Sequence, residues 1–303
     1  MAYEEFSYLS DNAAEFSLPA PADVALRREF VDLGDGRRMS TLVWGAGPAE
    51  FVLVHGGAQN AHTWDTVALA LNRPLIAVDL PGHGHSDGPS ADGMLSVDAN
   101  AADVAIAVRA LAPAATAVVG MSLGGLTSIA LTSAAPELVR SLVLVDITPG
   151  VNREKSSAIS NFVNGPSSFP RFDDILARTV EHNPTRTVSS LRRGILHNAV
   201  QLDDGSWVWR YRRHAAGSLV DGRPLAPDYG GLWEAISNMQ IPIMLVRGML
   251  AQSVVDDADE AELLRRAPNA RIEHVANAGH SVQGDTPVEL ARLIENFAPT
   301  PRR

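Results

Sequence analysis

Short apolar runs alternate with longer stretches of helical periodicity along much of this chain. Four aliphatic runs lack the polar alternation of a half-exposed strand, so we expect strands that are buried on both faces of a sheet. These runs are Phe51–Val54, Leu75–Val78, Thr116–Val119 and Leu142–Val145. A hairpin is expected before them, because Arg28–Leu33 and Met39–Trp44 flank Gly34-Asp35-Gly36, whose glycines accept a positive φ. The order of the elements predicts an α/β fold around a mostly parallel sheet.

Helical periodicity follows the second and third of these strands, at Asp98–Leu111 and Leu123–Ala134. The alternation then stops between residues 150 and 238, where helical patches are punctuated by Pro and Gly. It resumes with expected strands and helices at Ile241–Val246, Asp257–Ala267, Arg271–Val275 and Pro287–Phe297. We therefore expect a core made of residues 1–149 and 239–303, interrupted by a helical cap at residues 150–238.

Composition and charge narrow the possible functions. The 303 residues include no cysteine, which excludes disulfide scaffolds, thiolate metal sites and a cysteine nucleophile. The formal charge of −10 disfavours general binding to nucleic acid. Residues 150–238 carry 11 basic and 9 acidic side chains, so the acidity belongs to the expected core. The acidic N-terminus does not resemble a signal peptide and no apolar run is long enough to span a membrane, so we expect a cytoplasmic protein.

The most informative segment is Gly120-Met121-Ser122-Leu123-Gly124, a G-x-S-x-G motif between an expected strand and an expected helix. A sharp strand-to-helix turn holds the central serine in a strained conformation with its hydroxyl above the sheet. Glycines at the flanking positions leave room for that turn. The helix that begins beside Ser122 also points the positive end of its dipole at this position. The motif in this context predicts a nucleophilic serine.

Two further segments supply the groups that such a serine needs. The buried strand Phe51–Val54 continues into His55-Gly56-Gly57, where a glycine backbone can approach a reacting group closely. We expect the backbone N–H groups of Gly57 and Leu123 to form an oxyanion hole, and His55 to have a structural role.

The general base is expected at His280. It lies in a glycine-containing loop directly after the last expected strand, where it can reach the end of the central strand. An imidazole titrates near neutral pH and is suited to proton transfer. The chain has nine histidines, and His280 is the one placed correctly for this role in chain order.

Taken together, these motifs resemble those of the α/β-hydrolases, in particular actinobacterial esterase-type members with a helical cap. The similarity extends from about residue 28 to residue 297. Its carriers are HGG at His55–Gly57, DLPGHGHS at Asp79–Ser86, GMSLGG at Gly120–Gly125, VLVDITP at Val143–Pro149 and GHSVQGDTP at Gly279–Pro287, with Leu191–Gly194 and Gly205–Tyr211 in the insertion. The resemblance implies a Ser-His-Asp triad and ester hydrolysis.

The triad acid is where the sequence departs from the common family pattern. Relatives usually carry it in a turn after the strand that we place at Ile241–Val246, and no carboxylate occurs in that turn here. A minority of the family carries it after the preceding strand, which in this chain is the position of Asp146, 24 residues after Ser122. We favour Asp146. The alternatives are Asp256 or Asp257, which are also suited to begin a helix, and a triad without an acid.

The sequence therefore predicts a serine hydrolase that cleaves small carboxylic esters through an acyl-enzyme. Alternatives are hydrolysis of a carbon–carbon bond, a lactone or a thioester, or a non-catalytic protein that binds a small ligand. Trp207 and Trp209 of the insertion are candidates for the substrate pocket, or for the small core of the cap itself. We expect no metal and no organic cofactor, because the acidic cluster around Asp256 lacks the ligand spacing of a calcium loop.

Overall fold

The central element is an eight-stranded sheet with strand order β1-β2-β4-β3-β5-β6-β12-β13. The computed structural model of the chain describes residues 3–298 except 20–23, 90–95, 153, 212–218, 221–222 and 225–228. Strand β2 runs antiparallel to both of its neighbours, and the other pairs are parallel. The strands are β1 (Leu26–Asp32), β2 (Arg38–Trp44), β3 (Phe51–Val54), β4 (Leu75–Val78), β5 (Ala117–Met121), β6 (Leu142–Val145), β12 (Ile243–Gly248) and β13 (Arg271–Val275).

The direction of strand addition reverses between β3 and β5. The chain places β4 on one side of β3 and then returns to place β5 on the other side. Open parallel sheets bind ligands in the crevice outside the carboxyl ends of the strands at such a point. The His-Gly-Gly turn follows β3 and Ser122 follows β5, so both lie at this position.

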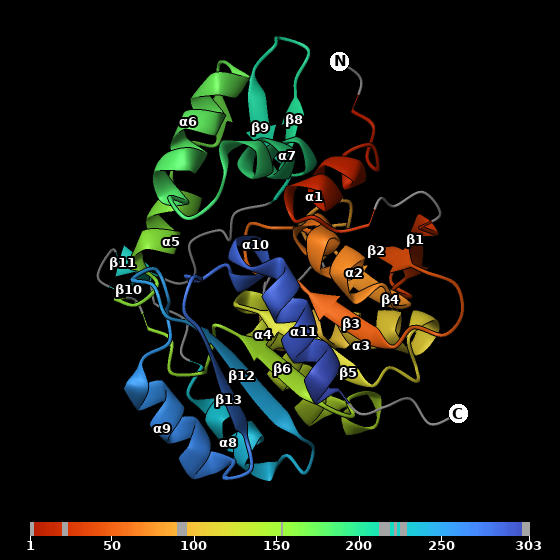
Figure 1. Ribbon diagram of the computed structural model, residues 1–303, viewed down its shortest axis with the longest axis vertical. Coiled ribbons are helices and arrows are strands. Elements are labelled where there is room, and N and C mark those ends of the chain that lie inside the picture. The colour runs from red at the N-terminus through yellow and green to blue at the C-terminus, as the bar shows by residue number, and fades with distance from the viewer. Residues whose placement is uncertain are drawn as a thin grey trace.

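Helices cover both faces of the sheet, and each layer closes its own hydrophobic cluster (Figure 1). One layer contains α1 (Leu9–Glu15), α2 (Asp65–Leu71), α10 (Val282–Asp285) and α11 (Pro287–Phe297). The other contains α3 (Val97–Leu111), α4 (Leu123–Ala134), α8 (Gly231–Asn238) and α9 (Asp257–Arg266). The four aliphatic strands β3 to β6 are fully buried between these layers. This explains why their sequences show no polar alternation.

Strand β5 runs further than the aliphatic pattern predicts. It begins at Ala117 and ends at Met121, because its pairing with β6 continues to Met121 opposite Val145. The chain therefore passes from strand to helix at the single residue Ser122, which the tight ladder on both sides holds in place.

The segment between β6 and α8 lies above the carboxyl ends of the strands (Figure 1). It contains α5 (Ser157–Val163), β7 (Ser168–Phe169), α6 (Phe172–His182), α7 (Val188–Asn198), β8 (Ala199–Gln201), β9 (Trp207–Trp209), β10 (Leu219–Val220) and β11 (Arg223–Pro224). Strands β7, β9 and β8 form a small sheet. These strands were not predicted, because runs of two or three residues are too short to show a period.

Helix α8, at the end of the expected insertion, packs on the sheet-covering layer of helices. Helix α8 packs against α4, and its Trp233 and Ile236 belong to the main hydrophobic cluster on that face of the sheet. The part of the insertion that has a small core of its own, made of Phe169, Ile175 and Ile195 with Ala199, ends before α8. Trp233 is therefore a residue of the α/β core.

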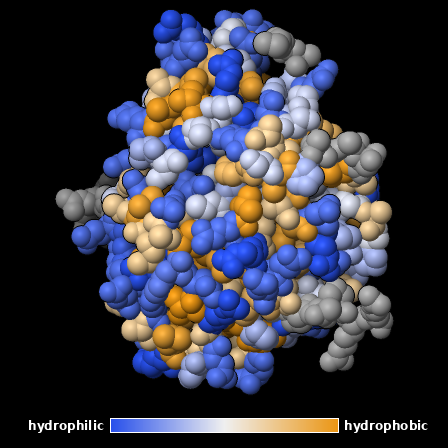
Figure 2. Space-filling model, in the orientation of Figure 1, coloured by the Kyte–Doolittle hydropathy of each residue, from blue (hydrophilic) through white to orange (hydrophobic). Residues whose placement is uncertain are grey.

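Within the described residues, no helix has both the length and the apolar character needed to cross a bilayer. On the face shown in Figure 2, hydrophobic side chains form small groups that are separated by hydrophilic ones.

Candidate active site

Ser122 occupies the turn between β5 and α4 in a strained backbone conformation, with φ of 51° and ψ of −121°. Non-glycine residues rarely adopt such angles unless the surrounding structure enforces them. The enforcement comes from close packing at the two motif glycines. A Cβ at Gly120 would lie 2.4 Å from the carbonyl oxygen of Gly124, and one at Gly124 would lie 2.2 Å from that of Val54. The glycines are therefore required by close approach between the first turn of α4 and the strands.

The His-Gly-Gly turn lies directly beside this serine. A Cβ on Gly56 would be 3.1 Å from Cβ of Ser122, and one on Gly57 would be 3.9 Å from Cδ2 of Leu123. In the described part of the chain, the backbone N–H groups of Gly57 and Leu123 donate to no protein acceptor. Leu123 is the first residue of α4, where N–H groups have no partner within the helix. Two uncommitted donors thus flank Ser122.

Buried histidines hold the turn that carries Gly57. Nδ1 of His55 donates to the carbonyl oxygen of Gly56 at 2.7 Å, and its Nε2 accepts from the backbone N–H of Leu80 at 2.9 Å. Burial lowers the pKa of His55, which keeps the imidazole neutral, as this pattern of one donor and one acceptor requires. Nε2 of His83 likewise accepts from the N–H of Ala58 at 3.2 Å. These contacts give the DLPGHGHS motif and His55 a structural role in fixing the turn.

His280 and Asp146 are brought together although 134 residues separate them. Nδ1 of His280 lies 2.9 Å from Oδ2 of Asp146, and both side chains are buried. Asp146 follows Val145 of β6, which pairs with Met121 just before Ser122. The imidazole is therefore held at the same edge of the sheet as Ser122. Its Nε2 is shielded from solvent and has no hydrogen-bond partner among the described residues.

The loop after β12 holds Asp146 in place. Oδ1 accepts hydrogen bonds from the N–H of Gly248 at 2.9 Å and from Oγ of Ser253 at 2.6 Å, while Oδ2 accepts from the N–H of Val254 at 3.0 Å. Asp146 itself has φ of 48°, a left-handed conformation that Asp tolerates better than most residues. This loop, where relatives commonly carry the acid, here provides the donors that bind an acid from the neighbouring strand.

The two alternative acids lie in other contacts. Asp256 is the N-cap of α9, where its side chain accepts from the N–H of Asp259, and it also pairs with Lys155 at 2.8 Å. The side chain of Asp257 is 95% exposed and pairs with Arg247 at 2.7 Å. The expectation that both residues begin a helix is confirmed, and neither contacts His280 in any hydrogen bond or ion pair of the described residues.

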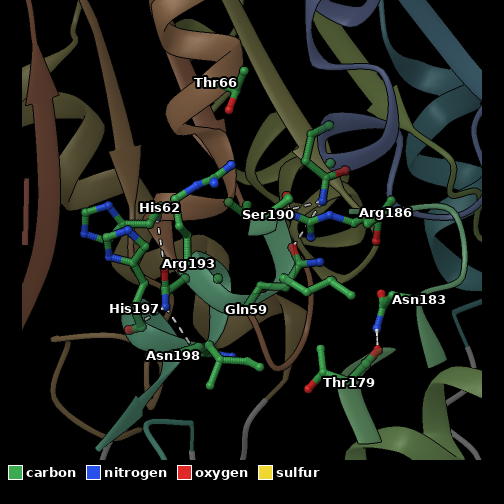
Figure 3. Close-up of a pocket in the computed structure, with 18 of the residues that line it drawn as sticks. Gln59, His62, Thr66, Thr179, Asn183, Arg186, Ser190, Arg193, His197 and Asn198 are labelled. Carbon is green, nitrogen blue, oxygen red and sulfur yellow. Dashed lines mark hydrogen bonds between the residues drawn. The ribbon is translucent and has the colours of Figure 1, made fainter. Parts of the chain in front are cut away.

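A cavity of about 150 Å³ lies between the insertion and the core (Figure 3). It adjoins the loop that carries His280. Gln59, from the turn after β3, and Ser281, which follows His280, form part of its wall; Ser122, Asp146 and His280 do not line it. Of the two tryptophans expected in a pocket, Trp209 lines the cavity. Trp207 does not, and its ring packs edge-on against Phe172 with centroids 5.1 Å apart. Trp207 of β9 packs on the small core of the insertion, as does Phe172 of α6.

His62, Asp65 and His197 are the group that comes nearest to a set of metal ligands in the described chain, with one donor atom from each within 4.8 Å of the others. The two imidazole rings are stacked with centroids 3.8 Å apart, so their lone pairs lie in nearly parallel planes. Both nitrogens of His62 are engaged, one with Asp65 and one with Glu5, each at 2.9 Å. The arrangement is a buried hydrogen-bonded network.

The charges of the two stacked rings differ. Burial lowers the pKa of His62, but the carboxylates of Asp65 and Glu5 outweigh that effect and raise the pKa to about 9. Burial and the neighbouring His62 lower the pKa of His197 well below its usual range. A protonated ring therefore stacks on a neutral one, and this pair joins the core to α7 of the insertion.

The N-terminal segment bridges the core and the insertion (Figure 1). The sequence did not predict this role. Arg193 of α7 forms an ion pair with Glu15 and donates to Asn12 at 2.7 Å, while Tyr3 bonds to His197 at 2.7 Å. Such partners lie 178 to 194 residues apart in the sequence, so no local pattern connects them.

Comparisons with known proteins give matches over most of the chain. A family described as the alpha/beta hydrolase fold matches residues 51–287. Esterase Rv0045c of Mycobacterium tuberculosis is 41% identical over 98% of this chain and 96% of its own length. Its crystal structure has a TM-score of 0.82 to this chain at 41% identity and covers 98% of both chains. The 2-(acetamidomethylene)succinate hydrolase of Mesorhizobium japonicum is 30% identical over 84% of this chain and 88% of its own length.

Proposed function

The chain belongs to the α/β-hydrolase fold family and is a carboxylic ester hydrolase, and we propose that it cleaves small esters through an acyl-enzyme formed on Ser122. The observation that carries this proposal is the buried bond between His280 and Asp146 at the sheet edge where the strained Ser122 stands. The engaged Nδ1 leaves Nε2 of the imidazole as the nitrogen that can take a proton.

In the proposed reaction, Oγ of Ser122 attacks the ester carbonyl carbon while its proton passes to Nε2 of His280. The carbonyl oxygen becomes an oxyanion, which accepts hydrogen bonds from the N–H groups of Gly57 and Leu123. Collapse of this intermediate breaks the bond to the alcohol oxygen, which leaves with the proton from His280. Water then attacks the acyl-enzyme, giving its proton to His280, and the collapse of the second intermediate releases the acid and restores the Ser122 hydroxyl.

Asp146 acts on the imidazole in two ways. It accepts from Nδ1 and so fixes the tautomer whose Nε2 can accept a proton, and its charge stabilises the imidazolium that forms during the reaction. The three donors from the loop after β12 hold the carboxylate in the orientation that this role needs.

We also propose that the insertion, taken as residues 150–230, acts as a lid over the active site. Its position above the carboxyl ends of the strands supports this role (Figure 1). The cavity between α7 and the turn after β3 supports it as well, since a substrate enclosed there is shielded from water.

The acyl-enzyme predicts a burst in pre-steady-state kinetics. On mixing with p-nitrophenyl acetate, about one equivalent of p-nitrophenol per active site should appear before the slower steady state, provided that hydrolysis of the acyl-enzyme limits turnover. The measurement is stopped-flow absorbance with enzyme at several concentrations, and the burst should scale with enzyme. Two results together would contradict acyl transfer to the protein. One is release of p-nitrophenol without a burst, and the other is oxygen-18 from labelled water in the alcohol rather than in the acid.

A further inference from the structure

The cavity between the insertion and the core is lined by a positively charged side chain, that of Arg186. Arg186 comes from the loop between α6 and α7 and reaches into the cavity toward Ser190, to which its Nη2 donates at 2.6 Å (Figure 3). Its Nε is shielded from solvent and has no acceptor, and the guanidinium forms no ion pair with any described residue. A shielded charged donor without a partner is costly, so its retention calls for an explanation.

A second arginine that lines the cavity, Arg193, has hydrogen-bond and ion-pair partners for its guanidinium. Arg193 forms an ion pair with Glu15, and it donates to Asn12 and Ser189, both at 2.7 Å. Glu15 is thus already committed. Asp285, another carboxylate near Arg186, accepts from Oγ1 of Thr185 at 2.8 Å and from the N–H of Gly279 at 2.9 Å. Both nearby acids are therefore engaged by other groups.

The remaining lining is suited to an anion. It contains amide, hydroxyl, imidazole and guanidinium groups, and no Asp or Glu occurs among the described residues that form it. The guanidinium of Arg186 also packs closely on the backbone of α10, where a Cβ on Gly284 would lie 3.0 Å from Cζ. This contact limits the movement of the arginine where it lines the cavity. A planar guanidinium in a fixed position matches the two oxygens of a carboxylate.

The cavity adjoins the catalytic groups through two of its walls. Oε1 of Gln59 accepts from the N–H of Gly56, the residue before Gly57, at 3.3 Å. Ser281 directly follows His280. A substrate whose ester carbonyl reaches Ser122 can therefore extend past Gln59 and place a second functional group beside Arg186.

We propose that Arg186 binds a carboxylate at the far end of the acyl chain, so that the preferred substrates are monoesters of dicarboxylic acids. This inference rests on the proposed esterase function and specifies its substrate class. The described residues give the guanidinium no anionic partner, and a bound carboxylate supplies one.

The test compares anionic and neutral esters of equal length. Mono-p-nitrophenyl esters of dicarboxylic acids with six to ten carbons are paired with p-nitrophenyl esters of the corresponding fatty acids, and kcat/KM is measured for each. The wild-type protein should favour the anionic ester at the chain length that reaches Arg186. In Arg186→Gln the ratio of anionic to neutral kcat/KM should fall about 10- to 100-fold, the usual effect of losing a charged hydrogen-bonded contact.

Two further variants separate this site from general electrostatic attraction and from misfolding. Arg171→Gln removes an exposed positive charge from the same insertion and should leave the ratio at the wild-type value. Arg186→Lys keeps the charge but loses the planar fork, and should give an intermediate ratio even where Arg186→Gln folds poorly. Equal ratios in wild type and both Arg186 variants, or no preference for the anionic ester at any length, would overturn the carboxylate site. If the wild-type protein hydrolysed neither the anionic nor the neutral esters, the result would instead count against the esterase proposal.

Discussion

Replacing Ser122 by Ala is expected to reduce kcat for a p-nitrophenyl ester by roughly 10³- to 10⁶-fold, the range seen when a serine nucleophile is removed. The alanine deletes only Oγ, so it should not disturb the strained turn that the flanking glycines and strands impose. Steady-state kinetics and a thermal unfolding curve of the same preparation measure both effects. The folded variant should retain its melting temperature within a few degrees.

A matched control comes from a second serine in the same region. Ser281→Ala also removes one hydroxyl near His280, but this serine takes no part in the proposed proton transfer. It should retain activity within about tenfold, because its hydroxyl neither attacks the ester nor transfers a proton. If Ser122→Ala were as active as wild type, the nucleophile would have to be another residue.

Asp146→Asn is expected to lower kcat by about 10⁴-fold, because the amide NH₂ would donate a hydrogen bond to Nδ1 of His280, whereas the carboxylate accepts one. An Asn NH₂ in place of Oδ2 faces the N–H of Val254 and the Nδ1 position of His280. The imidazole would then carry its proton on Nε2 and could not accept one from Ser122. Steady-state kinetics across pH 6 to 9 measures the loss, and circular dichroism checks that the variant is folded.

Asp257→Asn is the control for this prediction. It removes a carboxylate of the alternative pair whose side chain is almost fully exposed, and its activity should stay close to that of the wild type. The opposite result, an inactive Asp257→Asn beside an active Asp146→Asn, would reject Asp146 as the acid.

Much of the fold follows from local sequence patterns. The buried strands β3 to β6 and the helices α3 and α4 match their predicted positions to within two residues, because aliphatic runs and helical periodicity report burial directly. The turn at Ser122 was predictable for a similar reason, since its glycines are required by contacts within a short segment. His280 and Asp146 needed chain order and family resemblance as well, because their contact joins two distant strand ends.

Other parts of the site depend on contacts that leave no local pattern. The donors that hold Asp146 are two backbone N–H groups and the hydroxyl of Ser253, and no residue type identifies them in the sequence. That Arg186 forms no ion pair with a described residue depends on where the carboxylates of Glu15 and Asp285 point. The packing of α8 on the core could not be read from its sequence either, because an amphipathic helix has the same pattern whether it covers a cap or a sheet.

The central claim, that Ser122 is the activated nucleophile, is tested most directly by labelling with a fluorophosphonate and mapping the adduct by peptide mass spectrometry. The proposed mechanism predicts one adduct per chain, located on the peptide that contains Ser122, with loss of esterase activity in proportion to labelling. It also predicts a strongly reduced labelling rate in Asp146→Asn. An adduct on another residue that accounts for the inactivation, or full esterase activity in a protein labelled at Ser122, would contradict the claim.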